Sequence, residues 1–395
     1  MSSSRSSDPV RRSPLGTLRR VAAALAGLAL LCAAIPARAS ATDFTRLEQL
    51  MRSAVADSVF PGASIAVIHH GRVVFHKAYG RLTYDPKSAP ADTTTIYDAA
   101  SLTKAVVTTS IAMQLVERDS LELASPVGRY RPAFASNGKG GVTVGQLMRH
   151  VSGLRAHRYF ADTCNGREEA LNAIDRDTLV CAPGSRTIYS DLNFMLLGSI
   201  EESLTGRGLD SNFRARFSGP LGMASTMFTP PPALLPRIAP TGEDGIWKLD
   251  RPRPLVNDQN AALLGGVSGH AGLFTTTGDL VKFVKMLMNG GALEGKRYVE
   301  ASTVAAFLER GDASRALGWD LVTPGGSSSA GSKFSASSWG HLGFTGTSIW
   351  VDPERKLAVI LLSNRVWPSP ANIKIRKFRP LLHDTVVDCI DAQGR

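Results

Sequence analysis

Cysteine is scarce in this sequence, and the motifs of common metal and redox sites are missing. The chain has four cysteines in 395 residues, with no CxxC pair and no HExxH or similar spacing among its eight histidines. Zinc sites and dithiol centres need closely spaced ligands of these types. We therefore expect neither a metal nor a cofactor.

Blocks of like charge are missing too. The formal net charge is +11, but residues 1–39 hold six arginines and one aspartate, and subtracting their +5 leaves about +6 for the rest. This excess is spread along the chain without a basic stripe interleaved with aromatics, so we expect no nucleic-acid binding. Attraction to an anionic envelope polymer is compatible with the charge but not specific to it.

The apolar run near the amino terminus is too short to span a membrane. It covers residues 21–35, fifteen residues against the roughly 20 that a membrane helix needs. Arginines precede it, and Pro36 and the triplet Ala37-Arg38-Ala39 follow, which is typical of a secretory signal peptide. We predict a signal peptide over residues 1–39 and a soluble protein in the periplasm or outside the cell, with no stable membrane insertion after cleavage. A retained leader is the alternative.

The cysteines leave two questions open. Lipidation at Cys32 is disfavoured because bulky Leu31 precedes it, where a lipoprotein signal normally has a small residue. Beyond the leader, Cys164 and Cys181 flank a short polar loop, and in an oxidising compartment they could form a disulfide or stay free. Cys389 has no evident partner.

The apolar periodicity predicts strands near both ends of the chain. Residues 43–59 have the three-and-four spacing of an amphipathic helix, and strand-like runs follow at 63–69 and 72–79. A second pair of strands is expected at 347–351 and 357–362, before a final helix over 371–389 with a kink or break at Pro380. Short connections favour antiparallel pairing. Helices are expected between the two pairs at 102–118, 144–150, 191–203, 211–217 and 277–289.

The predicted fold class is therefore α+β: an antiparallel sheet flanked by N- and C-terminal helices, with an inserted, mostly helical region. We expect one domain over residues 40–395. Its sheet part covers about 40–98 and 318–395, and its helical part about 99–317. Two long loops, at 229–260 and 323–338, are rich in proline or in glycine and serine, so they are functional rims or insertions.

Ser101 and Lys104 are the first candidate catalytic pair. Residues three apart lie on the same helix face, so the amine can reach the hydroxyl, and free N–H groups at a helix start favour developing negative charge. The lysine can act as base only if burial lowers its pKa from about 10.4 toward 7. SxxK alone is weak evidence, because a helix cap with a solvated lysine has the same pattern. A second copy, Ser136 to Lys139, lies in a glycine-rich loop and is ascribed to chance.

Two later motifs strengthen the pair. Tyr189-Ser190-Asp191 opens another predicted helix, where a buried tyrosine near a lysine can shuttle a proton. His341-Leu342-Gly343-Phe344 falls on a strand candidate, where Gly343 would let a substrate backbone approach. The Phe344 N–H could join that of Ser101 in an oxyanion hole. Each motif alone is more often structural.

Together, SxxK, YSD and HxG in this order resemble the penicillin-binding protein and serine β-lactamase superfamily. The resemblance is closest to the branch with class C β-lactamases, D-alanyl-D-alanine carboxypeptidases and related esterases, and it runs from about residue 44 to 364. Residues 146–154, 265–273 and 317–319 also look like that branch.

The resemblance implies roles for the matching residues. Ser101 would attack an acyl carbonyl, Lys104 would accept its proton, and Tyr189 would assist the leaving group and the hydrolytic water. Asp191 stands where the family usually has asparagine, and as a carboxylate it cannot donate a hydrogen bond but could pair with Lys104. His341 stands where β-lactamases keep a lysine. Because a histidine is only about a quarter protonated at pH 7, recognition of an anionic substrate is in question.

Three functions stay open at this point. The first is a D-alanyl-D-alanine carboxypeptidase or β-lactamase-type amide hydrolase that acts on a peptidoglycan peptide or a small molecule. The second is an esterase on the same machinery, favoured by His341, and the third is a non-catalytic penicillin-binding or sensing module. An α/β-hydrolase is disfavoured because no GxSxG occurs. We expect a monomer.

Overall fold

The computed structural model describes residues 42–242, 256–311, 314–323 and 328–392. The predicted signal peptide, its cleavage site and Cys32 lie outside these ranges. The chain from Thr42 onward forms one compact unit. Within the described ranges, every helix is too short or too polar to cross a bilayer.

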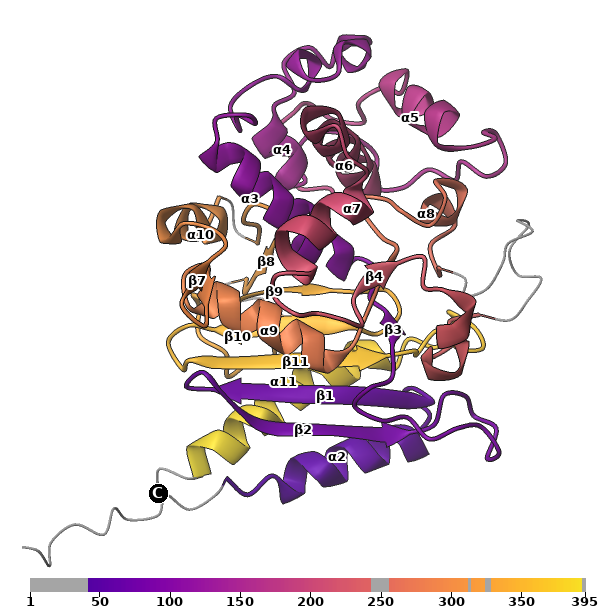
Figure 1. The fold of residues 1–395 in the computed structure, drawn as a ribbon, viewed down its shortest axis with the longest axis vertical. Helices are drawn as coiled ribbons and strands as arrows, with labels where there is room; N and C mark the ends of the chain where they lie inside the picture. Colours follow the sequence, from indigo (N-terminus) through magenta and orange to yellow (C-terminus); the bar gives the residue numbers. More distant parts are fainter. Residues whose placement is uncertain (1–41, 243–255, 312–313, 324–327, 393–395) are drawn as a thin grey trace, which may run out of the picture. The chain divides into compact units, whose positions relative to one another are not determined.

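An antiparallel sheet of six strands runs through this unit (Figure 1). Both predicted hairpins are confirmed, and the first strand of the chain pairs with the last, with Ala63 opposite Ser363. These two strands are buried along nearly their whole length because helices cover both sheet faces. In spatial order the strands are β2 (Arg72–Gly80), β1 (Gly62–His69), β11 (Leu357–Ser363), β10 (Ser348–Asp352), β9 (Trp339–Leu342) and β8 (Asp320–Leu321).

Alternate residues of β1 serve two separate hydrophobic clusters, because successive side chains of a strand point to opposite faces. Ile65 and Val67 pack with helices α2 (Thr45–Ala56) and α11 (Ile375–Asp391). Ala66 and Ile68 belong to the main core on the other face, where α9 (Thr277–Met288) contacts β1 and β11. Figure 1 shows α2 and α11 on one side of the sheet and α9 on the other.

Of the kink or break predicted at Pro380, the break does not occur, because α11 continues through this residue. Phe378 and Leu382, on either side of it, are both buried in the cluster under the sheet. This packing outweighs the roughly 3 kcal/mol that a proline costs in a helix interior. The C-terminal helix therefore stays intact alongside β10 and β11.

The predicted helices of the middle region are confirmed with small shifts, and Thr143 caps one of them with a reciprocal side-chain bond to Gln146. They are η1 (Lys104–Thr108, a π-helix), α3 (Thr109–Glu117), α4 (Val144–Met148), α6 (Asp191–Thr205), α7 (Leu209–Phe213) and η4 (Arg214–Ser218, a π-helix). Three further helices were not predicted: α5 (Arg167–Asp175), α8 (Gln259–Leu263) and α10 (Ala301–Leu308). Short 3₁₀ turns are η2 (Val127–Arg129), η3 (Pro132–Ala135) and η5 (Pro232–Arg237).

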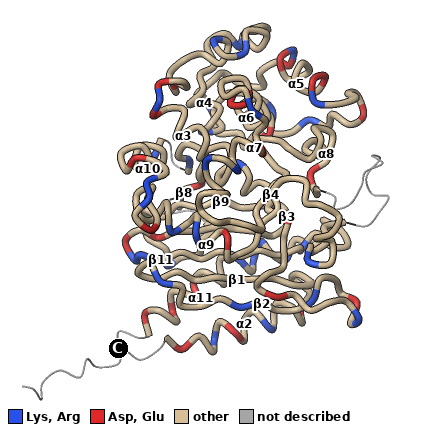
Figure 2. Tube along the Cα trace, viewed as in Figure 1, with Lys and Arg blue, Asp and Glu red and all other residues tan. Residues whose placement is uncertain are grey.

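A small second sheet also was not predicted. It joins β3 (Tyr97–Asp98), β5 (Leu273–Thr275) and β4 (Met227–Phe228), and a two-stranded ribbon pairs β6 (Ala292–Leu293) with β7 (Lys296–Arg297). Because β3 ends three residues before Ser101, this small sheet fixes the position of the chain segment that leads to Ser101. Acidic and basic residues are interspersed along the described chain in the view of Figure 2.

Candidate active site

Ser101 follows a backbone turn that is held in an unfavourable conformation. Ala100 has a φ of +48°, a left-handed geometry that costs an L-residue about 1–2 kcal/mol. Its N–H donates to Asp98 Oδ1 at 2.8 Å, and the Thr347 hydroxyl donates to the Ala99 carbonyl at 3.0 Å. Such strain persists only where the surroundings enforce it, and it is common at functional sites.

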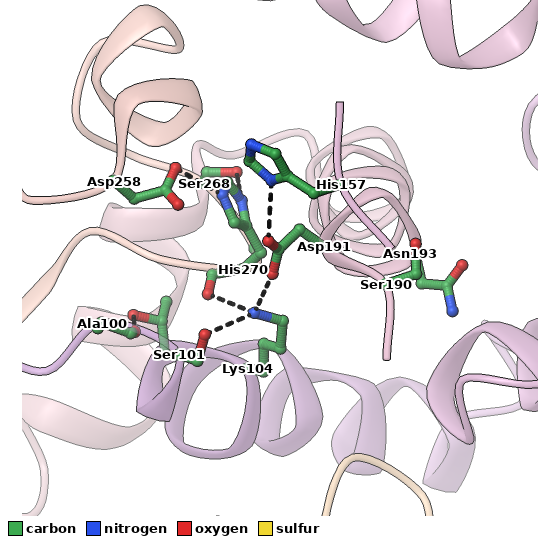
Figure 3. A network of polar contacts seen from close by, with 12 residues as sticks. Ala100, Ser101, Lys104, His157, Ser190, Asp191, Asn193, Asp258, Ser268 and His270 are labelled. Carbon is green, nitrogen blue, oxygen red and sulfur yellow. Dashed lines mark hydrogen bonds and ion pairs between the residues drawn. The ribbon is translucent and has the colours of Figure 1, made fainter. Parts of the chain in front are cut away.

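Lys104 lies one helical turn beyond Ser101, and its side chain is completely buried. Its Nζ donates to Ser101 Oγ at 2.9 Å and to the His270 carbonyl at 3.0 Å, and it lies 2.8 Å from Asp191 Oδ1 (Figure 3). The predicted contact between the amine and the hydroxyl is present. All three donors of an ammonium group therefore have an acceptor.

The condition under which Lys104 alone could act as the base, a pKa lowered by burial, is not met. Burial does oppose its charge, but the Asp191 carboxylate, with help from Tyr189, reverses the effect and raises the pKa above its ordinary value. The same interaction outweighs the burial of Asp191 and lowers the pKa of its carboxyl group. An opposite charge within hydrogen-bond distance favours both charged forms. Lys104 and Asp191 are therefore an ammonium–carboxylate pair at neutral pH.

Tyr189, two residues before the start of α6, also belongs to this cluster. Its ring lies 5.0 Å from Lys104 Nζ and 4.5 Å from the His150 ring. Burial raises the pKa of Tyr189, while the charge of Lys104 and hydrogen bonds to Lys104 and Ser101 oppose the rise. The phenol is thus neutral and within reach of both partners.

Asp191 has a second partner that the sequence motifs did not identify. Its Oδ2 lies 3.3 Å from His157 Nδ1, and the His157 side chain is half exposed to solvent. The hydrogen bond to Asp191 raises the pKa of His157, although burial opposes the rise. Figure 3 shows a continuous series of contacts from Ser101 through Lys104 and Asp191 to His157.

The backbone carbonyl of His270, which accepts a hydrogen bond from Lys104, is held in place by contacts of the His270 side chain. His270 contacts Asp258 Oδ1 through Nε2 at 2.9 Å and the Ser268 hydroxyl through Nδ1 at 2.8 Å. Both side-chain bonds fix the backbone whose carbonyl accepts from Lys104. The only sequence signal was that residues 265–273 resemble the family, with no role attached to any of them.

His341 lies on β9, as predicted, but it does not carry a charge at neutral pH. Burial lowers its pKa to about 4. Its Nδ1 lies 2.8 Å from the Leu342 carbonyl, so Nδ1 is the protonated nitrogen, and Nε2 has no hydrogen-bond partner within the described ranges. The one-quarter protonation at pH 7 that an ordinary histidine pKa would give is therefore not expected for His341.

Gly343 and Phe344 follow β9 directly. A Cβ on Gly343 would lie 1.9 Å from Thr347 Oγ1 and 2.5 Å from the Ala99 carbonyl oxygen. The missing side chain at Gly343 therefore makes room for Thr347 and Ala99 of the protein itself, and not for a substrate backbone. Phe344 is exposed, and its carbonyl accepts from Arg365 Nε at 2.7 Å.

All predicted site residues other than buried Lys104 line one cavity of about 670 Å³. Ser101, Tyr189 and Asp191 come from the helical region, and the 341–344 segment comes from the sheet. The cavity lies where the two parts of the fold meet, which is a common position for a ligand site. Within the described ranges, no three potential ligands gather in a way that would hold a metal ion.

Two further expectations concern residues away from the cavity. The possible disulfide is not formed: Cys164 and Cys181 are free thiols. Cys164 is buried in the main core, and helix α5 lies between the two cysteines along the chain. In the second SxxK copy, Lys139 donates to the Asp177 carbonyl and Ser136 to the Asp175 carbonyl, so each has a structural role.

Comparisons with known proteins agree with this geometry. The sequence model of the family described as Beta-lactamase matches residues 47–380 of this chain. A relative from Escherichia coli (strain K12), provisionally named a D-alanyl-D-alanine carboxypeptidase, is 31% identical over 364 residues, covering 81% of this chain and 82% of its own. A Salmonella typhimurium relative with the same name is 30% identical over 358 residues, with the same coverage.

Solved structures show the same fold. A penicillin-binding protein homologue from Caulobacter crescentus has a TM-score of 0.71 at 21% identity, over 88% of this chain and 97% of that one. EstCE1, described as a hydrolase with promiscuous acyltransferase activity, has a TM-score of 0.68 at 19% identity, over 85% and 98%. The family match over most of the chain and the relative at 31% identity agree with the site geometry: the chain belongs to the beta-lactamase family of serine hydrolases.

Proposed function

We propose that this protein is an exported hydrolase that forms an acyl-enzyme on Ser101, of the D-alanyl-D-alanine carboxypeptidase or β-lactamase type. The observation that carries the proposal is the 2.9 Å contact between Lys104 Nζ and Ser101 Oγ at the wall of a cavity that also presents Tyr189. The provisional name of the E. coli relative supports the carboxypeptidase reading.

The ion pair determines how Ser101 would lose its proton. As Oγ attacks the acyl carbon, Lys104 passes one proton to Asp191 and takes the proton of Ser101. Lys104 keeps its charge, and one proton has moved in net from Ser101 to Asp191. The contacts of 2.9 and 2.8 Å are short enough for both transfers.

Breakdown of the tetrahedral intermediate needs a proton for the leaving group. Tyr189 would donate it, because its ring lies 5.0 Å from Lys104 Nζ and both Lys104 and Ser101 act on its hydroxyl, and it would regain a proton from the Lys104–Asp191 pair. The N–H groups of Ser101 and Phe344 would stabilise the oxyanion. Water then attacks the acyl carbon and gives its proton to Asp191 through Lys104. The bond between the acyl carbon and Ser101 Oγ breaks, and the proton returns through Lys104 to Oγ as the acid leaves.

An esterase is the second candidate, and one observation favours it. His341 is neutral where β-lactamases keep a lysine, and a neutral ester needs no fixed cation at that position. The structural likeness to EstCE1 fits the same reading. The non-catalytic module is disfavoured because Ser101, Lys104 and Tyr189 are all present and in contact.

Mass spectrometry of the intact mature protein tests the proposal. The wild type and Ser101→Ala are each incubated with a penicillin, a D-Ala-D-Ala peptide and a short-chain p-nitrophenyl ester, while product release is followed. A penicilloyl adduct with peptide cleavage supports the carboxypeptidase, and rapid penicillin turnover supports a β-lactamase. Ester turnover without an adduct supports the esterase. Full activity of Ser101→Ala would exclude the acyl-enzyme.

A further inference from the structure

His150 holds the chain on both sides of Tyr189. Residues 186–190 have no regular secondary structure, so the position of the tyrosine is not fixed by a helix or a strand. The Ile188 N–H donates to the His150 carbonyl at 2.8 Å, and the Ser190 N–H donates to His150 Nδ1 at 2.9 Å. The backbone before and after Tyr189 is therefore anchored to a single residue.

The His150 ring also packs against the ring of Tyr189. The two centroids lie 4.5 Å apart, with the ring planes inclined by 34°. His150 is only 2% exposed and does not line the active-site cavity. Arg315 and His341 lie 5.1 and 6.0 Å from the same tyrosine ring, and both do line the cavity. His150 thus supports Tyr189 from behind the cavity wall, where it cannot touch a substrate.

The His150 ring is neutral, which lets it accept a hydrogen bond. Burial lowers the pKa of His150 well below its ordinary value, and the charges of Arg315 and Lys104 lower it further. Both nitrogens of a protonated imidazole are donors, so only the neutral ring can accept the Ser190 N–H at Nδ1. The proton of the ring is therefore on Nε2.

His150 also occupies a backbone position that favours glycine. Helix α4 ends at Met148, and the N–H groups of His150 and Val151 donate back to carbonyls of this helix. This is a Schellman arrangement, in which the residue in the place of His150 is left-handed and is usually glycine. His150 has a φ of +59°, which costs an L-residue about 1–2 kcal/mol. The backbone does not favour a side chain here, so the contacts with Tyr189 and Ser190 distinguish histidine at this position.

A second polar contact ties the same segment to the start of α6. The Ser152 hydroxyl donates to Asn193 Oδ1 at 2.7 Å, and Asn193 Nδ2 donates to a carbonyl of α4 at 3.0 Å. In Figure 3, Asp191 points toward Lys104, whereas Asn193 extends away from it. Residues 147–152 therefore hold α6 at a face that is turned away from the ion pair.

We propose that His150 is a positioning residue for Tyr189, which affects catalysis by holding the tyrosine in place and without contact with the substrate. This inference rests on the proposed function, in which Tyr189 donates a proton to the leaving group. It gives a role to a residue of the stretch 146–154, whose likeness to the family had no role attached to it.

Two esters of one acyl group test this role. p-Nitrophenolate leaves without a proton, whereas ethoxide needs one, so a misplaced proton donor slows hydrolysis of ethyl butyrate far more than that of p-nitrophenyl butyrate. The ratio of kcat/KM for the ethyl and the p-nitrophenyl ester is measured for the wild type, His150→Ala, His150→Asn and Tyr189→Phe. Asn212→Ala is the control, because Asn212 is buried and hydrogen-bonded to Thr205 but does not line the cavity.

We expect His150→Ala to lower this ratio by about 100-fold, the effect of displacing a catalytic group by about 1 Å. His150→Asn should recover part of the loss, because asparagine tolerates a left-handed backbone and its Oδ1 can accept the Ser190 N–H. Asn212→Ala should keep the wild-type ratio, since a general loss of stability affects both esters alike. A wild-type ratio in every His150 variant that folds would overturn the role.

A double substitution shows whether His150 acts through Tyr189. His150→Ala should lower kcat/KM for ethyl butyrate in the wild type but hardly at all in Tyr189→Phe, because residues that act as a unit are not additive. An equal loss in both backgrounds would overturn the proposal. Activity of Ser101→Ala on p-nitrophenyl butyrate would instead overturn the proposed function.

Hydrogen exchange covers the case in which neither ester is hydrolysed, because it needs no turnover. Deuterium uptake of the peptide that covers residues 186–192 is followed by mass spectrometry in the wild type, His150→Ala and Asn212→Ala. We expect faster uptake in His150→Ala alone, because the Ser190 N–H has lost its acceptor. Unchanged uptake would show that His150 does not hold this segment and would overturn the proposal.

Discussion

Lys104 and Asp191 form an ion pair, with Nζ 2.8 Å from Oδ1 and the lysine side chain completely buried. An asparagine at position 191, the residue usual in the family, would bring no charge and would leave burial to lower the pKa of the lysine. The carboxylate reverses this and keeps Lys104 protonated. In the proposed mechanism the pair therefore exchanges a proton internally as Ser101 loses its own.

Asp191→Asn tests this exchange. Without the carboxylate, burial becomes the main influence on Lys104 and lowers its pKa toward neutral pH. We expect kcat/KM at pH 7 to fall by about 100-fold, the size of a lost proton-transfer group. A new limb should appear in which activity rises with pH as Lys104 loses its proton. Asp191→Glu, which keeps the charge, should show no such limb. An unchanged pH profile in Asp191→Asn would contradict the exchange.

His157→Gln tests the second contact of Asp191. The groups that act on the charge of His157 are Asp191 and Asp258, which favour it, and Lys104, which opposes it. As pH rises through its raised pKa, His157 becomes neutral, and Asp191 then accepts a proton more readily. Wild-type kcat/KM should rise by up to about 10-fold in this step, the effect of one charged hydrogen bond.

The His157→Gln variant should lack this rise of kcat/KM with pH. His70→Gln, at an exposed turn, is the control and should keep it. The measurement is kcat/KM between pH 5.5 and 8.5. The prediction fails should His157→Gln and the wild type give superimposable profiles.

His383→Gln probes stability rather than activity. His383 is fully buried against the Ser329 carbonyl, and burial lowers its pKa to about 4. In the unfolded chain the pKa is about 6.5, so the unfolded state binds more protons below that pH. The contribution to stability is complete above pH 6.5 and is lost as pH falls toward 4. His341 acts in the same direction.

We expect the free energy of unfolding to depend less on pH in this variant. The decrease between pH 7 and 4.5 should be smaller by about 2 kcal/mol, from a shift of more than two pKa units at 1.36 kcal/mol each. Urea denaturation at the two pH values gives this number, with His70→Gln as the exposed control. An identical decrease in His383→Gln and the wild type would show that His383 does not gain a proton when the protein unfolds.

Gly343→Ala tests the joint between β9 and the turn before Ser101. The added Cβ would meet Thr347 Oγ1, which can rotate away, and the Ala99 carbonyl, which cannot. Displacement of residues 99–101 by even about 1 Å should reduce kcat/KM by about 100-fold. Gly141→Ala is the control, because its Cβ would meet no atom within 4 Å. Wild-type activity in Gly343→Ala would show that the turn tolerates the displacement.

Features that depend on local patterns could be predicted from the sequence. Strand-like apolar runs in 63–79 and 347–362, each pair joined by a short turn, predicted both hairpins. The three-residue spacing of Ser101 and Lys104 predicted their contact, because it is a property of any helix turn. Those two features, with YSD and HxG, were enough to identify the family.

The tertiary structure alone decided the charge states and the partners. The pKa of Lys104 depends on Asp191, and that of His341 on how deeply β9 is buried. The role of His157 depends on chain segments that meet only after folding. A pKa is the sum of burial and of charges within a few ångströms, and no spacing along the chain specifies which distant residues supply them.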